Sequence, residues 1–302
     1  MNQQLLCGGI EGGGTKFVCA VGTAPDHIIN EARFPTTTPA QTLAKAGEFF
    51  EPYARQGSLA AIGIGSFGPV DLEPSSPTYG TITTTPKPGW SNTDMVSSLY
   101  RSLGVPIIFE LDVNAAAFGE YYWNPENRTR NPLVYFTIGT GIGGGIIVNE
   151  KIVHGLVHPE AGHMLIPHDW KTDPFPGVCP YHGDCFEGLA SGPAMQQRWG
   201  QPAETLPADH AGWDLEAAYI ALAMSNVICT LSPKRIVLGG GVMQHEGLFP
   251  MVWDRVRQYL NGYIHSPGIL ERIDDTIVPP SLGHRSGILG AIALARLAVE
   301  GK

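Results

Sequence analysis

The sequence has little of what a nucleic-acid-binding or membrane-spanning protein needs. Its 302 residues include 19 lysines and arginines against 28 aspartates and glutamates, which gives a net charge of −9. Nucleic acids and anionic membranes require a basic surface, so this charge argues against either as the main partner. No apolar run approaches the roughly 20 residues of a membrane span. The first residues, MNQQLLCGG, lack the basic and apolar regions of a signal peptide. We therefore expect a cytoplasmic protein with neither nucleic acid nor membrane as a partner.

Two familiar nucleotide-binding motifs are also missing. In Gly12-Gly13-Gly14-Thr15-Lys16 the lysine follows the threonine, which is the wrong order for a Walker loop. Residues 139–144, GTGIGG, match the G-x-G-x-x-G of dinucleotide-binding proteins, but that loop must open a helix. The segment after it, IIVNEKIVHG, is β-branched and poor in helix formers. We therefore expect neither a Walker loop nor a Rossmann site.

What the chain does have is glycine in runs that separate apolar stretches. We predict two strand–turn–strand hairpins, one over residues 5–21 and one from Pro132 through a turn at residues 139–145 to a strand over residues 146–153. Such turns can point successive N–H groups at a phosphate, although a purely structural role is the alternative. The remaining pattern predicts helices over residues 40–53, 94–103, 114–122, 215–231, 246–263 and 286–299, and strands over 60–64, 106–111 and 235–238. The likeness of the two hairpins suggests a duplicated lobe.

Three of these segments together resemble the ROK family (repressors, open reading frames and sugar kinases). Residues 9–16, GIEGGGTK, are similar to its first phosphate loop, residues 139–145 to its second, and residues 238–242, LGGGV, to its adenosine loop. The resemblance covers essentially the whole chain. It implies an α/β, actin-like ATPase (ribonuclease H-like) fold with two lobes around a nucleotide cleft. We place one lobe at residues 1–113 plus 286–302, with the first phosphate loop, and the other at residues 114–285, with the second loop, the zinc site and the adenosine loop.

The resemblance also implies ATP and Mg²⁺ as cofactors. The residues expected to bind ATP are Gly13, Gly14, Thr15, Lys16, Thr140, Gly141, Pro193, Gly239, Gly240 and Gly241. The family usually has an aspartate before the first glycines, where this chain has Glu11. We expect Glu11 to keep the aspartate's role, which is to reach Mg²⁺ through water.

Asp112 is the expected catalytic base. Phosphoryl transfer to a sugar hydroxyl needs a carboxylate that accepts the hydroxyl proton. Asp112 ends the strand IIFEL, and the segment DVNAAAFGE resembles the family's catalytic segment. The alternative is that Asp112 or Asn114 is only a helix N-cap. In many family glucokinases an asparagine precedes the aspartate and holds a pyranose hydroxyl, whereas this chain has Leu111.

The expected reaction is therefore the phosphorylation of fructose by ATP to fructose 6-phosphate. Mannose, glucose and an N-acylhexosamine are the alternative substrates. By resemblance, Glu160, His163 and Glu187 contact the sugar hydroxyls. A sugar-sensing regulator is a further alternative, but family repressors carry a helix-turn-helix before the first phosphate loop, which here begins within the first dozen residues. Members of the family are commonly dimeric, so the resemblance also implies a homodimer.

A Cys/His cluster predicts a structural zinc site. Cys179, His182 and Cys185 form a C-x-x-H-x-x-C pattern, and tetrahedral zinc needs four such ligands. By resemblance His163 is the fourth, although His154, His158 and His168 compete for that place. Two free cysteines beside unrelated histidines is the alternative. If one ring nitrogen of His163 binds zinc and the other faces the sugar, zinc braces the sugar pocket.

Overall fold

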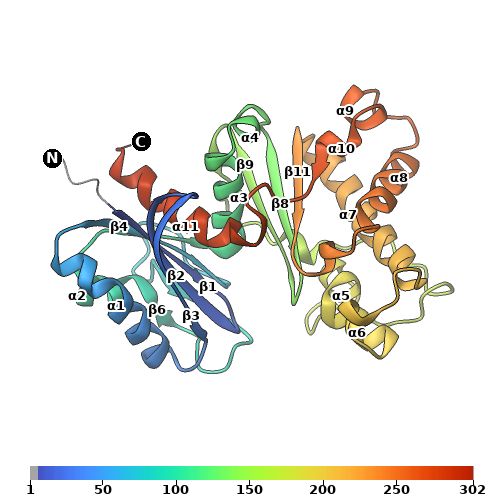
Figure 1. Cartoon of the computed structure of the whole chain (residues 1–302). Coiled ribbons are helices and arrows are strands. Elements are labelled where there is room, and N and C mark those ends of the chain that lie inside the picture. The colour runs from blue at the N-terminus through green and yellow to red at the C-terminus, as the bar shows by residue number, and fades with distance from the viewer. Residues whose placement is uncertain (1–5, 302) are drawn as a thin grey trace. The chain divides into compact units, whose positions relative to one another are not determined.

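The computed structural model describes residues 6–301, which form two compact units. Unit 1 contains residues 6–128, 152–158 and 285–301, and unit 2 contains residues 129–151 and 159–284. Figure 1 shows one five-stranded sheet in each unit. Leu5, where we expected the first hairpin to begin, lies outside the described residues.

Unit 1 is built on a sheet with the strand order β3-β2-β1-β4-β7. Strands β1 and β2 form an antiparallel hairpin, and β4 and β7 continue the sheet in parallel with β1. The unit's elements are β1 (Leu6–Gly12), β2 (Lys16–Ala24), β3 (His27–Pro35), α1 (Pro39–Arg55), β4 (Leu59–Ser66), β5 (Thr81–Ile82), β6 (Thr93–Asp94), α2 (Met95–Leu103), β7 (Ile107–Leu111), α3 (Asp112–Trp123) and α11 (Ser286–Val299).

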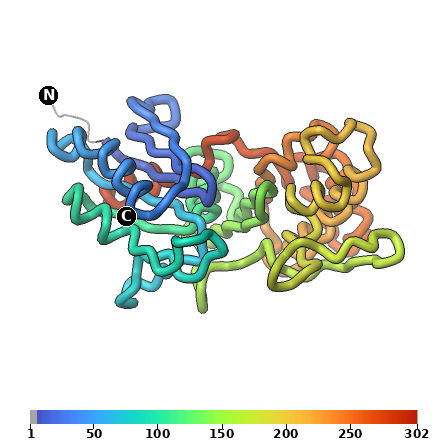
Figure 2. The backbone as a smooth tube through the Cα atoms, turned by 90° about the horizontal axis from the view of Figure 1, so that it is seen from below, coloured from blue at the N-terminus to red at the C-terminus, as the bar shows by residue number. Residues whose placement is uncertain are grey.

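Helices cover both faces of this sheet (Figure 1). Successive residues of β1 face opposite sides, as the period of a strand requires. A methyl group at Gly8 would lie 2.8 Å from the Phe50 ring of α1, whereas one at Gly9 would lie 2.8 Å from the Ile292 side chain of α11. The glycines therefore let α1 approach one face and α11 the other. Figure 2 shows the red C-terminal segment running beside the blue N-terminal one.

Unit 2 repeats the same plan with the strand order β10-β9-β8-β11-β12. Strands β8 and β9 form the antiparallel hairpin, and β11 and β12 run parallel to β8. The elements are β8 (Leu133–Ile138), β9 (Ile142–Val148), β10 (Lys151–Ile152), α5 (Phe186–Ala190), α6 (Gly192–Trp199), α7 (Gly212–Leu231), β11 (Arg235–Gly239), α8 (Leu248–Leu260), α9 (Pro267–Leu270), α10 (Ile273–Thr276) and β12 (Ile277–Val278), with α4 (Pro125–Thr129) and β10 at the unit boundaries. The common plan agrees with the duplicated lobe suggested by the two glycine hairpins.

The division between the units differs from the predicted one. We expected the first lobe to end at residue 113, but α3 and residues 152–158 also group with unit 1. The reason for α3 is its close packing on α11. A methyl group at Gly119 would lie 2.8 Å from the Gly290 Cα, and one at Gly290 would lie 1.8 Å from the Ala115 carbonyl oxygen. Helix α11 belongs to unit 1, where it packs against β1, β4 and α3.

One further expectation needs correction. The second hairpin turn was predicted over residues 139–145, but β9 already begins at Ile142 and includes Gly143–Gly145. Among the described residues, one helix is long and apolar enough to cross a membrane by length and composition, although Asp214 and Glu216 interrupt its apolar run. Helix α7 has 20 residues and a mean hydropathy of 1.3, although 56% of that stretch is buried inside the structure. It packs against α5 and α8, as a core helix of a soluble protein does.

Candidate active site and metal centre

Asp112 lies where the sequence placed it, at the carboxyl end of a parallel strand. It follows β7 directly and is the first residue of α3. Its Oδ1 accepts a hydrogen bond from the Val113 N–H at 2.8 Å, and the residue is partly exposed. The N-cap residue of α3 is Leu111, which makes no side-chain cap. The alternative role as N-cap, for Asp112 or for Asn114, is therefore not the one seen.

The Leu111 side chain is buried beside the loop that follows β4. A methyl group at Gly68 would lie 2.7 Å from the Leu111 Cδ1, so the leucine packs directly on that glycine. An apolar group at this position offers no hydrogen bond to a sugar hydroxyl. The structure thus gives a physical reason why a pocket built around an asparagine at residue 111 is not formed here.

A charged pair fixes the turn that carries Asp112. The Glu110 carboxylate is buried, and its Oε1 accepts hydrogen bonds from the Leu111 N–H at 2.9 Å and the Asn114 side-chain amide at 2.8 Å. Its Oε2 lies 2.8 Å from the His154 Nε2. This hydrogen bond raises the pKa of His154 above its ordinary value. His154 therefore pairs with Glu110, and it is not in the metal cluster for which it was a competing ligand.

The first phosphate loop is a tight turn between β1 and β2. The Gly13 N–H donates to the Lys16 carbonyl at 2.9 Å, and the Thr36 hydroxyl donates to the Gly13 carbonyl at 2.6 Å. Gly14 and Thr15 form the turn between Gly13 and Lys16, and the side chains of Thr15 and Lys16 are exposed. The loop is thus a fixed turn whose outer groups are open to a ligand, as the hairpin prediction required.

Glu11 lies beside this loop, with its side chain turned toward α11. The Glu11 carboxylate accepts a hydrogen bond from the Ile288 N–H, and a methyl group at Gly287 would lie 2.8 Å from the Glu11 Cδ. Burial raises the pKa of Glu11 above its ordinary value. The carboxylate therefore caps the first turn of α11, a role that its sequence position alone did not reveal.

The second phosphate loop borders a cavity of about 820 Å³ inside unit 2. Of the predicted ATP-binding residues, Thr140, Pro193 and Gly241 line this cavity. Gly239 and Gly240 do not, since Gly239 packs against the Tyr135 ring and Gly240 makes a turn with a φ of +94°. Gly139, from the predicted second phosphate loop, also lines it. Further lining residues that were not predicted are Gly192, Gln196, Trp213, Gln244 and His245. Only glycine adopts the positive φ of Gly240 at little cost, so the turn after β11 depends on this glycine.

An aromatic pair forms one wall of this cavity. The rings of Trp213 and His245 are stacked with centroids 4.0 Å apart, and the Trp213 Nε1–H donates to the Pro207 carbonyl at 3.0 Å. A flat, anchored ring of this kind suits a nucleobase. Sequence reasoning missed the pair because Trp213 begins a helix that reads as core, and nothing in the sequence joins it to residue 245.

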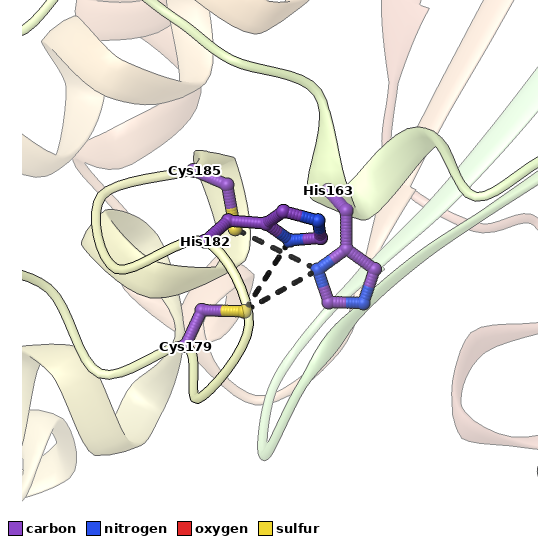
Figure 3. Close-up of side chains that lie close together, drawn as sticks. All are labelled: His163, Cys179, His182 and Cys185. Atoms are coloured by element: carbon purple, nitrogen blue, oxygen red, sulfur yellow. Dashed lines mark hydrogen bonds between the residues drawn. The ribbon is translucent and has the colours of Figure 1, made fainter. Parts of the chain in front are cut away.

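The Cys/His cluster is assembled as predicted, with four donor atoms that all lie within 4.8 Å of one another (Figure 3). The His163 Nδ1 lies 3.7 Å from the Cys179 Sγ and 3.6 Å from the Cys185 Sγ, and the His182 Nδ1 lies 3.6 Å from the Cys179 Sγ. Tetrahedral zinc with bonds of about 2.0–2.3 Å places its N and S ligands about 3.6 Å apart, so the distances fit. Burial raises the pKa of the Cys185 thiol to about 11, and a bound cation must displace its proton.

The other candidate ligands point elsewhere. The His168 Nδ1 lies 3.0 Å from an Asp184 carboxylate oxygen, and its Nε2 lies 2.9 Å from the Asp173 carbonyl. The His158 Nε2 accepts a hydrogen bond from the Val70 N–H at 3.3 Å. Among the described residues, His163 is therefore the histidine that joins the C-x-x-H-x-x-C segment, which agrees with the resemblance.

The expected sugar ligands fall into two groups. Glu160 is exposed and directly precedes the short turn Ala161–His163, and the His163 Nδ1 faces the sulfurs, which leaves its Nε2 for another partner. Glu187, on α5, is partly buried and its Oε2 accepts a hydrogen bond from the Ile142 N–H at 2.8 Å. In this structure Glu187 thus holds the residue that ends the second phosphate loop.

Comparison with known proteins identifies the class to which this fold and these loops belong. Residues 7–298 match the ROK family, and the chain is a member of it. It has the α/β, actin-like ATPase fold of that family's sugar kinases. A ROK hexokinase from Thermus thermophilus has a similar structure, with a TM-score of 0.78 and 24% identity over 99% of this chain and all of that one.

Two sequence relatives are closer. The fructokinase of Zymomonas mobilis is 43% identical over 100% of this chain and 99% of its own length. The fructokinase of Pediococcus pentosaceus is 42% identical over 98% of this chain and 99% of its own length. The similarity to both therefore extends over nearly the full length of each protein.

Proposed function

We propose that this protein is an ATP-dependent fructokinase, which converts fructose and ATP to fructose 6-phosphate and ADP. The observation that carries the proposal is the identity of 42–43% to two fructokinases over nearly the full length of each. The buried Leu111 supports the choice of sugar, because it removes the hydrogen-bonding group that a pyranose pocket of the glucokinase type would use.

Each candidate residue has a separate role in the proposed reaction. Asp112 accepts the proton of the fructose hydroxyl while that oxygen attacks the γ-phosphorus and the bond to the ADP oxygen breaks. Glu160 and the Nε2 of His163 bind other hydroxyls of the sugar. The N–H groups of the two glycine loops bind phosphate oxygens, and the cavity bordered by Trp213 and His245 takes the adenosine. Mg²⁺, carried with ATP, neutralises phosphate charge.

The metal proposed for the Cys/His cluster is zinc in a structural role. Two thiolates and two imidazoles are a closed N/S set, which leaves no position for water or substrate. His163 belongs to this set and directly follows the segment with Glu160, so zinc would fix the position of the sugar-binding turn. Metal analysis of the purified protein tests the assignment, and less than half an equivalent of zinc without chelator treatment would count against it.

The test of the function is a coupled ADP-release assay with ATP and Mg²⁺ against fructose, mannose, glucose and N-acetylhexosamines. We expect the highest kcat/KM on fructose. A preference for mannose, glucose or a hexosamine would keep the kinase class and discard the interpretation of Leu111. Absence of turnover on every sugar, with zinc-loaded and folded protein, would refute the kinase function. The homodimer stays a prediction, for which light scattering on the eluting protein is the measurement.

A further inference from the structure

Ile142, the first residue of β9, is held from two sides. Its N–H donates to the Glu187 Oε2 at 2.8 Å. On its carbonyl side lies Gly162, where a methyl group would stand only 1.7 Å from the Ile142 oxygen and 2.6 Å from its carbonyl carbon. Real Cβ atoms do not approach backbone so closely, so the turn that contains Gly162 rests directly on Ile142. Both backbone polar groups of one residue are thus covered by two separate segments.

The two segments that hold Ile142 are the ones that carry the metal ligands. Gly162 is followed by His163, and Glu187 comes two residues after Cys185 in the helix α5. A backbone hydrogen bond joins the segments, because the N–H of the buried Phe186 donates to the Met164 carbonyl at 2.9 Å. A change in the distance between His163 and Cys185 therefore reaches Ile142 by two short paths. The path from His163 passes through Gly162, and the path from Cys185 passes through Phe186 and Glu187.

Ile142 in turn ends the second phosphate loop, residues 139–141. A methyl group at Gly141 would lie 2.7 Å from the Glu187 Oε2, so the carboxylate also touches the loop. The Gly139 N–H donates to the Gly141 carbonyl at 2.9 Å, and Gly139 lines the cavity of unit 2 together with Thr140. Displacing Ile142 therefore displaces groups that face the cavity.

We propose that the metal centre positions the second phosphate loop, with Glu187 and the Gly162 turn acting as a clamp on Ile142. Zinc, by joining His163 to Cys179, His182 and Cys185, fixes the two sides of the clamp and sets the affinity for nucleotide. Glu187 is then a positioning residue for the nucleotide as well as an expected sugar ligand. The inference rests on the proposed function only in taking the loop as a nucleotide-binding element.

The test is the affinity for ADP with Mg²⁺ and no sugar, measured by calorimetry on zinc-loaded and zinc-stripped protein. Leaving out the sugar separates the clamp from any role of Glu187 or His163 in sugar binding. We expect stripping to weaken ADP binding about tenfold or more, the size of losing one hydrogen bond to a charged group. Adding zinc back should restore the affinity.

Two substitutions test the clamp without changing a metal ligand. Glu187→Leu removes the acceptor of the Ile142 N–H, so it should weaken ADP binding while zinc, measured by its release to a colorimetric chelator, stays bound. Gly162→Ala should both weaken ADP binding and speed the release of zinc, because the new methyl group pushes His163 away from the cluster. The matched controls are Glu271→Leu, on an exposed side chain, and Gly155→Ala, whose methyl group would meet no atom nearer than 3.9 Å. Both should bind ADP and zinc as the unaltered protein does.

The outcomes of these experiments distinguish the clamp from the proposed fructokinase function. ADP affinity within twofold of the unaltered protein, in stripped protein that remains folded and in Glu187→Leu, would overturn the clamp. If stripping unfolds the chain, Glu187→Leu alone decides, since it keeps all four metal ligands. If ADP binding depends on zinc but the protein phosphorylates no sugar, the proposed fructokinase function is refuted and the clamp is supported.

Discussion

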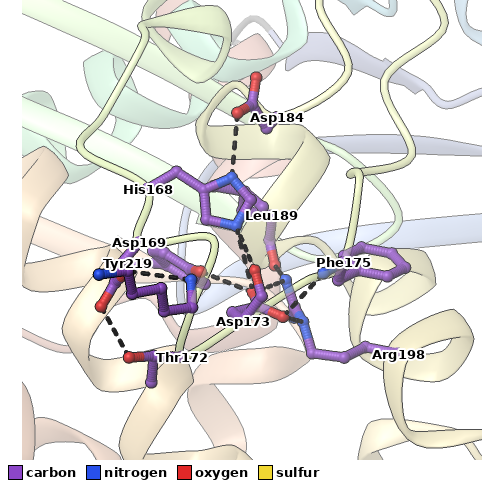
Figure 4. Close-up of polar contacts among 10 residues, drawn as sticks. His168, Asp169, Thr172, Asp173, Phe175, Asp184, Leu189, Arg198 and Tyr219 are labelled. Carbon is purple, nitrogen blue, oxygen red and sulfur yellow. Dashed lines mark hydrogen bonds and ion pairs between the residues drawn. The ribbon is translucent and has the colours of Figure 1, made fainter.

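The carboxylate of Asp173 is the centre of a buried charge network in unit 2, and its removal should be among the most damaging single changes there (Figure 4). Its Oδ2 accepts the Tyr219 hydroxyl at 2.6 Å and lies 3.2 Å from the Arg198 guanidinium, and both side chains of this ion pair are at most 6% exposed. The pair joins the segment before the Cys/His cluster to α6, and Tyr219 joins it to α7. Asp173→Ala would leave Arg198 buried without its carboxylate.

The expected cost follows from that burial. Breaking a buried ion pair by removing one partner costs about 3–5 kcal/mol. The nearby Glu216 does not easily replace Asp173, because burial raises the pKa of its carboxyl well above the ordinary value, which disfavours the charged form. The matched control is Asp214→Ala, which removes an exposed carboxylate of α7 from its ion pair with Arg255 of α8 and should cost about 1 kcal/mol or less.

Hydrogen exchange followed by mass spectrometry on peptides of α6 and α7 is the suitable assay, because it reports the opening free energy of unit 2 separately from that of unit 1. A loss for Asp173→Ala no larger than that of Asp214→Ala would refute the reasoning. It would mean that the network is solvated or that Arg198 finds another acceptor besides the Leu189 carbonyl, to which it already donates at 2.9 Å.

Three further predictions follow from the sites. Asp112→Asn should lower kcat about 10²- to 10⁴-fold while fructose still binds, which single-turnover kinetics and calorimetry would check; a near-normal kcat would remove Asp112 as the base. Glu160→Gln should raise KM for fructose much more than KM for ATP in the coupled assay, and equal increases would argue against direct contact. The pKa of His154 is raised by Glu110, so the stabilisation by this pair is complete below a pH of about 6.5 and is lost as pH rises through the raised pKa. Because the His154 side chain is 45% exposed, this stabilisation amounts to about 1 kcal/mol or less. The unfolding midpoints of the unaltered protein and His154→Gln should converge at high pH, and parallel midpoints would contradict the reasoning.

Local patterns predicted the elements that carry the chemistry. The two hairpins, the strand that ends before Asp112 and the helix over residues 286–299 were all found, because period and turn residues mark them within a few positions. The C-x-x-H-x-x-C spacing similarly identified three members of the Cys/His cluster. The fourth member, His163, came only from the resemblance, since no local rule joins it to Cys179, 16 positions later.

What sequence reasoning missed depends on contacts between distant segments. The exposed edge strand β3 alternates only weakly, and α6 is short, although Ser191 followed by Gly192 and Pro193 is a recognisable helix start. Glu11 caps α11 through the N–H of Ile288, 277 positions later in the chain. The Glu187 carboxylate accepts a hydrogen bond from the N–H of Ile142, 45 positions earlier. Such pairings are set by the approach of backbones in three dimensions and leave no periodic trace.

The glycines that let α11 lie against β1, β4 and α3 also set an order of events during synthesis. A methyl group at Gly63 would lie 1.9 Å from the Ala291 carbonyl, and one at Gly290 would lie 1.8 Å from that of Ala115, so the sheet of unit 1 has a face made to fit this one helix. On a ribosome that face stays open until residues 286–299 emerge, whereas nearly all of unit 2 has emerged by then. The unit that is translated first is thus the last to be completed, and its exposed apolar face is a natural client for a chaperone that meets nascent chains.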